Sequence, residues 1–156
     1  MKYVIVLAMV IFYNPMVEAM SIFGVGKTCV FSEVKLRLQL HGKPVSKAKV
    51  TRKWDWNAQH SDEGVTDQQG MVSFPAVFES SVSRLLPMEL VIGQQLSVEI
   101  DGEEKIFWTN SKREPEENAE YGGLPFVAEC ELSQDEELIE DYGSLMVTMC
   151  KLIKEK

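Results

Sequence analysis

Apolar and polar residues alternate with a period of two along most of this chain, a pattern that predicts β-strands. The clearest segment is 34–40, in which Val and Leu alternate with Lys, Arg and Gln. Comparable patterns predict further strands at 45–56, 71–75, 95–100, 105–109, 126–132 and 145–150. About seven short strands with almost no helix predict an all-β fold, an antiparallel sandwich of immunoglobulin-like size.

Turn signals separate these strands. His41-Gly42-Lys43-Pro44 and Thr66-Asp67-Gln68-Gln69-Gly70 are turn sequences, and Asp101-Gly102 is the strongest hairpin signal in the chain. The polar stretch 57–64 and the acidic stretch 114–123 are expected to be loops. Each predicted strand therefore ends at residues suited to reversing the chain.

Two short helices are also suggested. Ser133 followed by Glu136 matches a capping box, so 134–140 is expected to form one short acidic helix. Residues 80–86, just before Pro87, are compatible with one helical turn.

The first 19 residues have the pattern of a secretory signal peptide. Lys2 precedes an apolar run of 11 residues at 3–13, and Val17 and Ala19 are the small residues expected before a cleaved bond. The run is too short for a bilayer, which takes about 20 residues. Three parts are expected: a cleaved signal peptide at 1–19, an N-terminal leader segment at 20–31 and the sandwich domain at 32–153.

Charge is distributed unevenly along the chain. The whole sequence has 16 Lys and Arg against 24 Asp and Glu, a net charge of −8. Residues 114–150 contain 11 acids and no Lys or Arg, whereas 33–53 contains seven basic residues and one acid, Glu33. Such an acidic protein is poorly suited to nucleic acid or anionic membranes, and the polarity favours a charged protein partner with a basic surface.

Cys29, Cys130 and Cys150 all lie in the expected exported part. An oxidising compartment favours one disulfide and leaves one thiol. Cys130 with Cys150 is the first choice, because both fall in late strands that could be neighbours. Cys29 with either of them, or three buried thiols, are the alternatives.

Two segments resemble a known family pattern, G-x-P-V-x-x-A-x-V followed by T-D-x-x-G-x-[VF]-x-F. They are Gly42-Lys43-Pro44-Val45-Ser46-Lys47-Ala48-Lys49-Val50 and Thr66-Asp67-Gln68-Gln69-Gly70-Met71-Val72-Ser73-Phe74. The pattern is typical of carboxypeptidase-regulatory-like and transthyretin-like (prealbumin-like) domains, and it specifies a fold more than a function. The resemblance implies a β-sandwich like theirs.

The chain also resembles small exported proteins of Gram-negative bacteria that carry this domain alone, which implies a periplasmic location. Some exported proteins of this size, encoded beside secretion-system toxins, are periplasmic immunity proteins. Transthyretin-like hydrolases end in Tyr-Arg-Gly-Ser, but here Tyr142-Gly143-Ser144 lacks the Arg and precedes a strand, so we interpret it as a turn.

The sequence offers no convincing catalytic set. His41 lies at a predicted turn, and His60 beside Ser61 lies in a polar stretch. The acids at 135–141 could supply oxygen ligands to calcium, but they lack the spacing of a calcium loop. The expectation is a non-enzymatic protein with no catalytic residues, no metal site and no cofactor.

Two surfaces are candidates for binding. The first comprises the clustered acids, which could contact a basic protein: Glu114, Glu116, Glu117, Glu120, Asp135, Glu136, Glu137, Glu140 and Asp141. The second is a platform for a sugar or a peptide, formed by residues of one strand face: Arg52, Trp54 and Trp56. The first predicts an exported protein-binding module, such as an immunity protein that neutralises a secreted toxin. The alternatives are a carbohydrate- or peptide-binding accessory of the cell envelope, or a structural envelope module.

Overall fold

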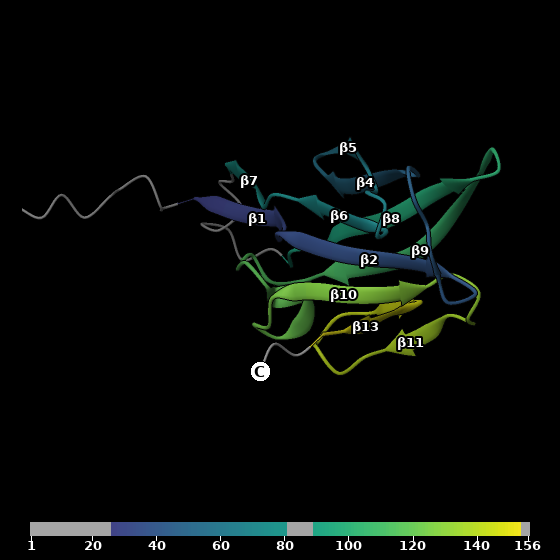
Figure 1. Ribbon diagram of the computed structural model, residues 1–156. Helices are drawn as coiled ribbons and strands as arrows, with labels where there is room; N and C mark the ends of the chain where they lie inside the picture. Colours follow the sequence, from purple (N-terminus) through teal and green to yellow (C-terminus); the bar gives the residue numbers. More distant parts are fainter. Residues whose placement is uncertain (1–25, 81–88, 154–156) are drawn as a thin grey trace, which may run out of the picture.

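The computed structural model describes residues 26–80 and 89–153, which fold almost entirely into β-strands (Figure 1). The strands are β1 (Lys27–Phe31), β2 (Val34–Leu40), β3 (Lys43–Pro44), β4 (Lys49–Trp56), β5 (Ala58–Val65), β6 (Met71–Phe74), β7 (Val77–Ser80), β8 (Ile92–Ile100), β9 (Glu103–Lys112), β10 (Phe126–Glu131), β11 (Glu137–Ile139), β12 (Met146–Thr148) and β13 (Cys150–Leu152). A single-turn 3-10 helix, η3 (Ala119–Tyr121), lies between β9 and β10.

Two sheets enclose the hydrophobic core. One has the order β13-β10-β2-β3, with β6 also paired to β2, and the other has the order β11-β12-β9-β8-β4-β5. Leu36 and Phe126 from the first sheet, and Leu96 and Trp108 from the second, are among the fully buried side chains. The predicted all-β sandwich is therefore confirmed, although the described residues form thirteen strand segments instead of about seven.

One strand pair departs from the antiparallel expectation. β2 and β10 run in the same direction, from Val34 beside Phe126 to Gln39 beside Glu131, as Figure 1 shows. The other pairs among the described strands are antiparallel. A long connection separates β2 from β10 in sequence, so no hairpin forces them to run in opposite directions.

The turn at Thr66–Gly70 shows why its residues have the observed spacing. Asp67 Oδ1 accepts hydrogen bonds from the backbone N–H of Gln69 and Met71, at 2.8 and 2.9 Å. Gly70 has φ +76°, and a Cβ there would lie 2.4 Å from the carbonyl oxygen of Leu38. Asp67 therefore closes the turn, and Gly70 allows it to pass directly against β2.

The same turn binds the other half of the sequence pattern. Thr66 Oγ1 accepts a hydrogen bond from Ala48 N at 2.9 Å, and Thr66 N donates to Ala48 O at 3.0 Å. Lys47 N donates to Thr66 O at 3.0 Å. The two segments of the motif are thus hydrogen-bonded neighbours in space.

The Asp101-Gly102 hairpin is confirmed. β8 and β9 pair up to Ile100 opposite Glu103, and the two turn residues have φ +54° and +81°. Positive φ at both central residues gives the turn that matches the twist of the flanking strands.

The expected loop at 57–64 is wrong. All of these residues except Asn57 belong to β5, which pairs with β4 along its whole length, from Lys49 opposite Val65 to Trp56 opposite Ala58. β5 lies at the edge of its sheet and is largely exposed, so its polar side chains remain in water while its backbone completes the ladder. Tertiary pairing here overrides weak strand propensity.

The expected acidic helix at 134–140 is also wrong. Ser133 Oγ donates to Glu131 Oε1 at 2.5 Å, and Glu137–Ile139 forms β11 against β12. A helix this short gains little without a packed face, whereas a strand gains ladder hydrogen bonds with β12.

The N-terminal part of the described chain differs from a simple leader segment. Lys27–Phe31 forms β1, which pairs with β7 and has Cys29, Val30 and Phe31 fully buried. The expected signal peptide, the rest of the leader and the helical turn at 80–86, apart from Ser80 in β7, lie outside the described residues.

The predicted closing strand at 145–150 divides between the two sheets. β12 pairs with β9, whereas β13 pairs with β10. Met149 lies between them: its N–H donates to Phe107 O at 2.9 Å, and its carbonyl accepts from Glu131 N at 3.3 Å. The chain thus crosses from one sheet to the other at Met149 and closes that side of the sandwich.

We expect Gly70→Ala to lower the free energy of unfolding by about 3 kcal/mol, through positive φ and the clash with Leu38 O. Gly102→Ala is the matched control, because Gly102 has φ +81° but a Cβ there would meet nothing within 4 Å. It should cost about 1 kcal/mol. Urea unfolding followed by Trp fluorescence measures both, and equal losses would contradict the proposed close approach.

Candidate functional site

Most of the predicted partner-binding acids are exposed and lie in two segments. Glu114, Glu116 and Glu117 lie in the connection after β9, here named the acidic loop (114–117). The other segment, here named the acidic edge (135–141), contains β11 and five acids: Asp135, Glu136, Glu137, Glu140 and Asp141.

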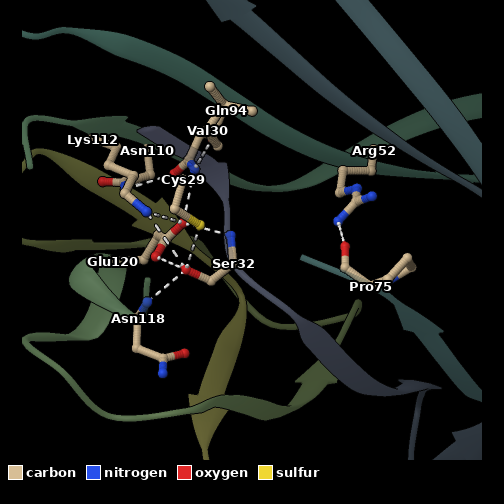
Figure 2. A network of polar contacts seen from close by, with 10 residues as sticks. All are labelled: Cys29, Val30, Ser32, Arg52, Pro75, Gln94, Asn110, Lys112, Asn118 and Glu120. Atoms are coloured by element: carbon tan, nitrogen blue, oxygen red, sulfur yellow. Dashed lines mark hydrogen bonds and ion pairs between the residues drawn. The ribbon is translucent and has the colours of Figure 1, made fainter. Parts of the chain in front are cut away.

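Glu120 does not belong to this exposed surface, and its prediction as a contact residue is wrong. Its side chain is fully buried at the centre of a polar network (Figure 2). Lys112 Nζ lies 3.1 Å from Glu120 Oε1, and Ser32 Oγ donates to Glu120 Oε2 at 2.5 Å. Gln94 Nε2 donates to Glu120 Oε1 at 2.8 Å. The carboxylate is therefore paired and hydrogen-bonded, as a buried charge requires.

The electrostatics of Glu120 follow from these contacts. Burial by itself raises the pKa of the carboxyl, but the Lys112 ammonium and the hydrogen bonds from Ser32 and Gln94 outweigh it. The pKa of Glu120 is therefore lowered, and the carboxylate stays ionised inside the protein.

The network also holds the acidic loop in place. Asn118 N donates to Ser32 Oγ at 2.7 Å, and Cys29 N donates to Pro115 O at 2.8 Å. β1 and the residue that follows it thus anchor both ends of the loop segment that precedes η3. The exposed acids are carried on backbone that is tied to the core.

Tyr121 connects the acidic loop to the acidic edge. Its hydroxyl accepts a hydrogen bond from Trp108 Nε1 at 3.0 Å, and its ring packs edge-on against Tyr142 with centroids 5.3 Å apart. Tyr142 directly follows Glu140 and Asp141 in sequence. The tyrosine pair therefore joins η3, which follows the acidic loop, to the turn that follows the acidic edge.

The acidic edge combines charge with exposed apolar side chains. Leu138, in β11, is 61% exposed, and Leu145, directly before β12, is 52% exposed. Ile139 packs against the core from the other face. This part of the surface can offer both hydrophobic contact and negative charge to a partner.

Glu131 shows that part of the acidic run has a structural role. Its carboxylate accepts hydrogen bonds from His41 N and Gly42 N, both at 2.8 Å, and from Ser133 N and Oγ. His41 and Gly42 have φ +52° and +72°. The hydrogen bonds lower the pKa of Glu131 to about 2, with the Ser133 hydroxyl contributing most.

The predicted platform of Arg52, Trp54 and Trp56 is wrong, because all three side chains are buried. Arg52 is fully buried, and the two tryptophans are 8% exposed. Their shared face is the inner face of the sheet. The Arg52 guanidinium donates to both oxygens of Asp62 and to Pro75 O, the latter at 2.7 Å (Figure 2).

The predicted disulfide between Cys130 and Cys150 is confirmed. It joins directly opposite residues of β10 and β13, just after the chain crosses between the sheets. Cys29 is a free thiol in the core, where burial raises its pKa and the nearby Lys112 opposes the increase. The disulfide is compatible with an oxidising compartment.

The two histidines lie in different parts of the fold. His41 forms the turn held by Glu131, and His60 is on β5, where its ring stacks on Trp54 with centroids 5.6 Å apart. Within residues 26–80 and 89–153, no three His, Cys, Asp or Glu side chains gather as a metal site. Nor does any helix in those ranges have the length and hydrophobicity to span a membrane.

A comparison with protein families gives one match. The family described as "Domain of unknown function (DUF6795)" matches residues 34–135. The chain belongs to this family. The matched range includes β2 to β10, with the acidic loop, and excludes β11, β12 and β13. Searches of curated proteins and of solved structures give no match. The resemblance of this DUF6795 protein to transthyretin-like domains therefore stays a prediction.

Sequence reasoning missed the buried network of the DUF6795 domain, but a signal was present. Gln94 falls at an inward position of β8, in step with the buried Ile92 and Leu96. Asn110 and Lys112 fall at inward positions of β9, opposite Gln94 and Ile92. Polar residues in the apolar phase of an alternating strand indicate a buried polar cluster, but the pattern does not show that Glu120 completes it.

We expect Lys112→Met to lower the free energy of unfolding by about 3–5 kcal/mol, because it leaves the buried Glu120 carboxylate without its cation. The double variant Lys112→Met with Glu120→Gln should lose less than the sum of the single changes. Lys35→Met is the control: Lys35 and Glu33 are about half exposed, and this change should cost less than about 1 kcal/mol. Urea unfolding decides, and similar losses for Lys112→Met and Lys35→Met would contradict a buried pair.

We expect Glu131 to stabilise the fold in a pH-dependent way. Its folded-state pKa, about 2, lies below the ordinary value of 4.5, so the folded state favours the ionised form. The stabilisation is complete above pH 4.5 and is lost as the pH falls from there through about 2.

The measurement is the difference in unfolding free energy between the wild type and Glu131→Gln across this pH range. The difference should shrink as the pH falls. Glu129→Gln, two residues earlier on β10, is the control. A difference that stays constant from above the ordinary carboxyl pKa down to the lowered one would show that the carboxylate does not hold the turn.

Proposed function

We propose that this DUF6795 protein is an exported, non-enzymatic binding module that holds a protein with a basic surface. In its most specific form, the proposal is a periplasmic immunity protein that neutralises a secreted bacterial toxin. The observation that carries it is the difference between how the basic and the acidic residues are neutralised.

The lysines on the outer face of β4 are paired within the fold. Lys49 Nζ lies 3.1 Å from Glu99 and 3.7 Å from Glu63, and Lys53 Nζ lies 2.9 Å from Glu104. These ion pairs cover the outer face of β4 and its neighbours. Little positive charge remains there for an external anionic partner.

The acidic edge is different. Within the described residues, Asp135, Glu136, Glu137, Glu140 and Asp141 form no ion pair with Lys or Arg. Their charges are held on one strand and the segments that flank it, and Tyr142, directly after Asp141, packs against Tyr121 of η3. An uncompensated acidic surface attracts a basic protein, raises its association rate and orients it.

Exposed leucines support protein binding over simple solubility. A solvated acidic segment needs no large apolar side chain, yet Leu138 and Leu145 are more than half exposed beside the acids. Apolar contact surrounded by charge is the arrangement of many protein interfaces. A basic cleft, such as that of a toxin acting on an anionic substrate, would be complementary to this surface.

The test is co-expression in bacteria. The full chain, including the predicted signal peptide, is produced together with the exported product of the adjacent gene. We expect the two to co-purify from the periplasm and the cells to survive. Replacing Glu117, Glu140 and Asp141 by Gln, Gln and Asn should slow association about tenfold at low salt, with less effect at high salt.

The control variant makes the same change in charge elsewhere, at Glu33, Glu63 and Glu103, each replaced by Gln. It should associate at nearly the wild-type rate. If the neighbouring product neither binds nor harms unprotected cells, the immunity function is wrong. If both variants behave alike, the acidic surface is not the contact.

A further inference from the structure

The outer edge of β11 has backbone groups that point away from its own sheet. Ser111 N donates to Leu145 O at 3.1 Å, and Met149 N donates to Phe107 O at 2.9 Å. Residues 145, 147 and 149 therefore direct their backbone groups toward β9. By alternation, Met146 and Thr148 direct theirs toward β11.

This register fixes the orientation of β11. Met146 lies opposite Ile139, and Thr148 lies opposite Glu137. Glu137 and Ile139 thus use their backbone N–H and C=O groups on β12. Leu138, between them, presents its N–H and C=O to the free side of the strand.

No described strand covers that side. The order of the sheet ends at β11, beyond which none of the strands in 26–80 and 89–153 pairs. Figure 1 shows β11 at the margin of the molecule, next to the segments that close the sandwich. An exposed strand edge can accept an extended segment of another protein, because main-chain hydrogen bonds continue the sheet.

The sequence along this edge places two apolar residues between acids. Within β11, alternation puts Leu138 on the outer face and Glu137 and Ile139 on the inner face. Glu136 directly precedes the strand, and Glu140 and Asp141 follow it, with Asp141 in the turn beyond. Two adjacent apolar residues are therefore flanked on each side by acidic pairs.

We propose that the β11 edge binds its partner by strand addition, taking an extended segment in which two adjacent apolar residues are flanked on each side by Lys or Arg pairs. This inference rests on the proposed function and specifies how the basic partner is held. In the added strand, each basic residue lies opposite an acid, and the apolar residues lie opposite Leu138 and Ile139.

The same pattern argues against a second copy as the occupant. Two β11 edges paired antiparallel through their outward Leu138 backbone groups would bring Glu136 of each copy opposite Glu140 of the other, which destabilises the pairing. The charges thus keep the edge from joining another copy of itself and leave it open to a basic segment.

The β11–β12 hairpin is a firm base for an added strand. β12 pairs with β9 along its length, and the disulfide between Cys130 and Cys150 fixes the chain just beyond it. Ile139 packs against the core below. Little ordering of β11 itself is then needed when a partner binds.

The experiment uses the purified protein and a synthetic peptide with the central sequence Lys-Lys-Val-Val-Lys-Lys. The control peptide has the same composition in the order Lys-Val-Lys-Lys-Val-Lys. We expect the first peptide to bind at least about tenfold more tightly, because only its apolar pair matches Leu138 and Ile139. Equal binding would mean that charge alone attracts the peptides and would overturn the proposal.

Amide hydrogen exchange provides a direct readout on the unaltered protein. Peptide binding should slow exchange at the Leu138 N–H, which points to the free edge, and should leave Glu137 and Ile139 little changed. Binding without protection of Leu138 would overturn strand addition, since contact through side chains alone would leave this amide in water.

Two variants at Leu138 separate backbone from side chain. Leu138→Pro removes the outward N–H without removing a bond to β12, and an edge position tolerates proline in this orientation. Leu138→Ala keeps the N–H and removes the same apolar contact. We expect the proline variant to bind the peptide about tenfold more weakly than the alanine variant. Equal binding by the two variants would show that the outward N–H is not used.

The failure of this inference is distinguishable from failure of the proposed function. If the adjacent gene's product binds the wild type and Leu138→Pro equally, the function stands and strand addition is wrong. If that product does not bind but the peptide protects Leu138, the edge accepts a strand and the assigned partner is wrong.

Discussion

The buried ion pair between Lys112 and Glu120 is the interaction on which the arrangement of the acidic surface depends. Glu120 lies in η3, just after the exposed acidic loop, yet its carboxylate is surrounded by donors from β8, β9 and the residue that follows β1. Removing either charge would leave the other in the core, at a cost of several kcal/mol. The pair therefore fixes the position of the acidic loop. Tyr121, directly after Glu120, packs against Tyr142 and so also contacts the turn beyond β11.

A second constraint acts at the opposite side of the same region. The last strands divide between the two sheets at Met149, and the disulfide joins β13 to β10 directly after the crossing. β12 is consequently held by its pairing with β9 and by the disulfide just after it. β11 pairs with the other side of β12 and is the last strand of its sheet. The fold thus combines a rigid base with an open, acidic strand edge. That combination is the basis of the proposed binding of another protein.

The amino-acid pattern predicted much of the strand arrangement, because strands with one buried face leave a period-two signal. It was correct for β2, β6, β8, β9 and β10, and for the Asp101-Gly102 turn. It was wrong for β5, whose polar residues give no such signal at an exposed edge, and for β11, where a local capping pattern competed with pairing to β12. The disulfide was among the alternatives because both cysteines fall in late strands, and only the register of β10 and β13 placed them opposite each other.

The sequence by itself determined the all-β class, the turns and the separation of acidic from basic residues, since these follow from local spacing and composition. Tertiary structure alone decided which charges face water. Glu120 and Arg52 are buried because distant residues complete their hydrogen bonds, and the lysines of β4 are neutralised by acids from neighbouring strands. The acids of 135–141 remain exposed because β11 is the last strand of its sheet. Burial and pairing depend on partners far away in the chain, and no local pattern specifies them.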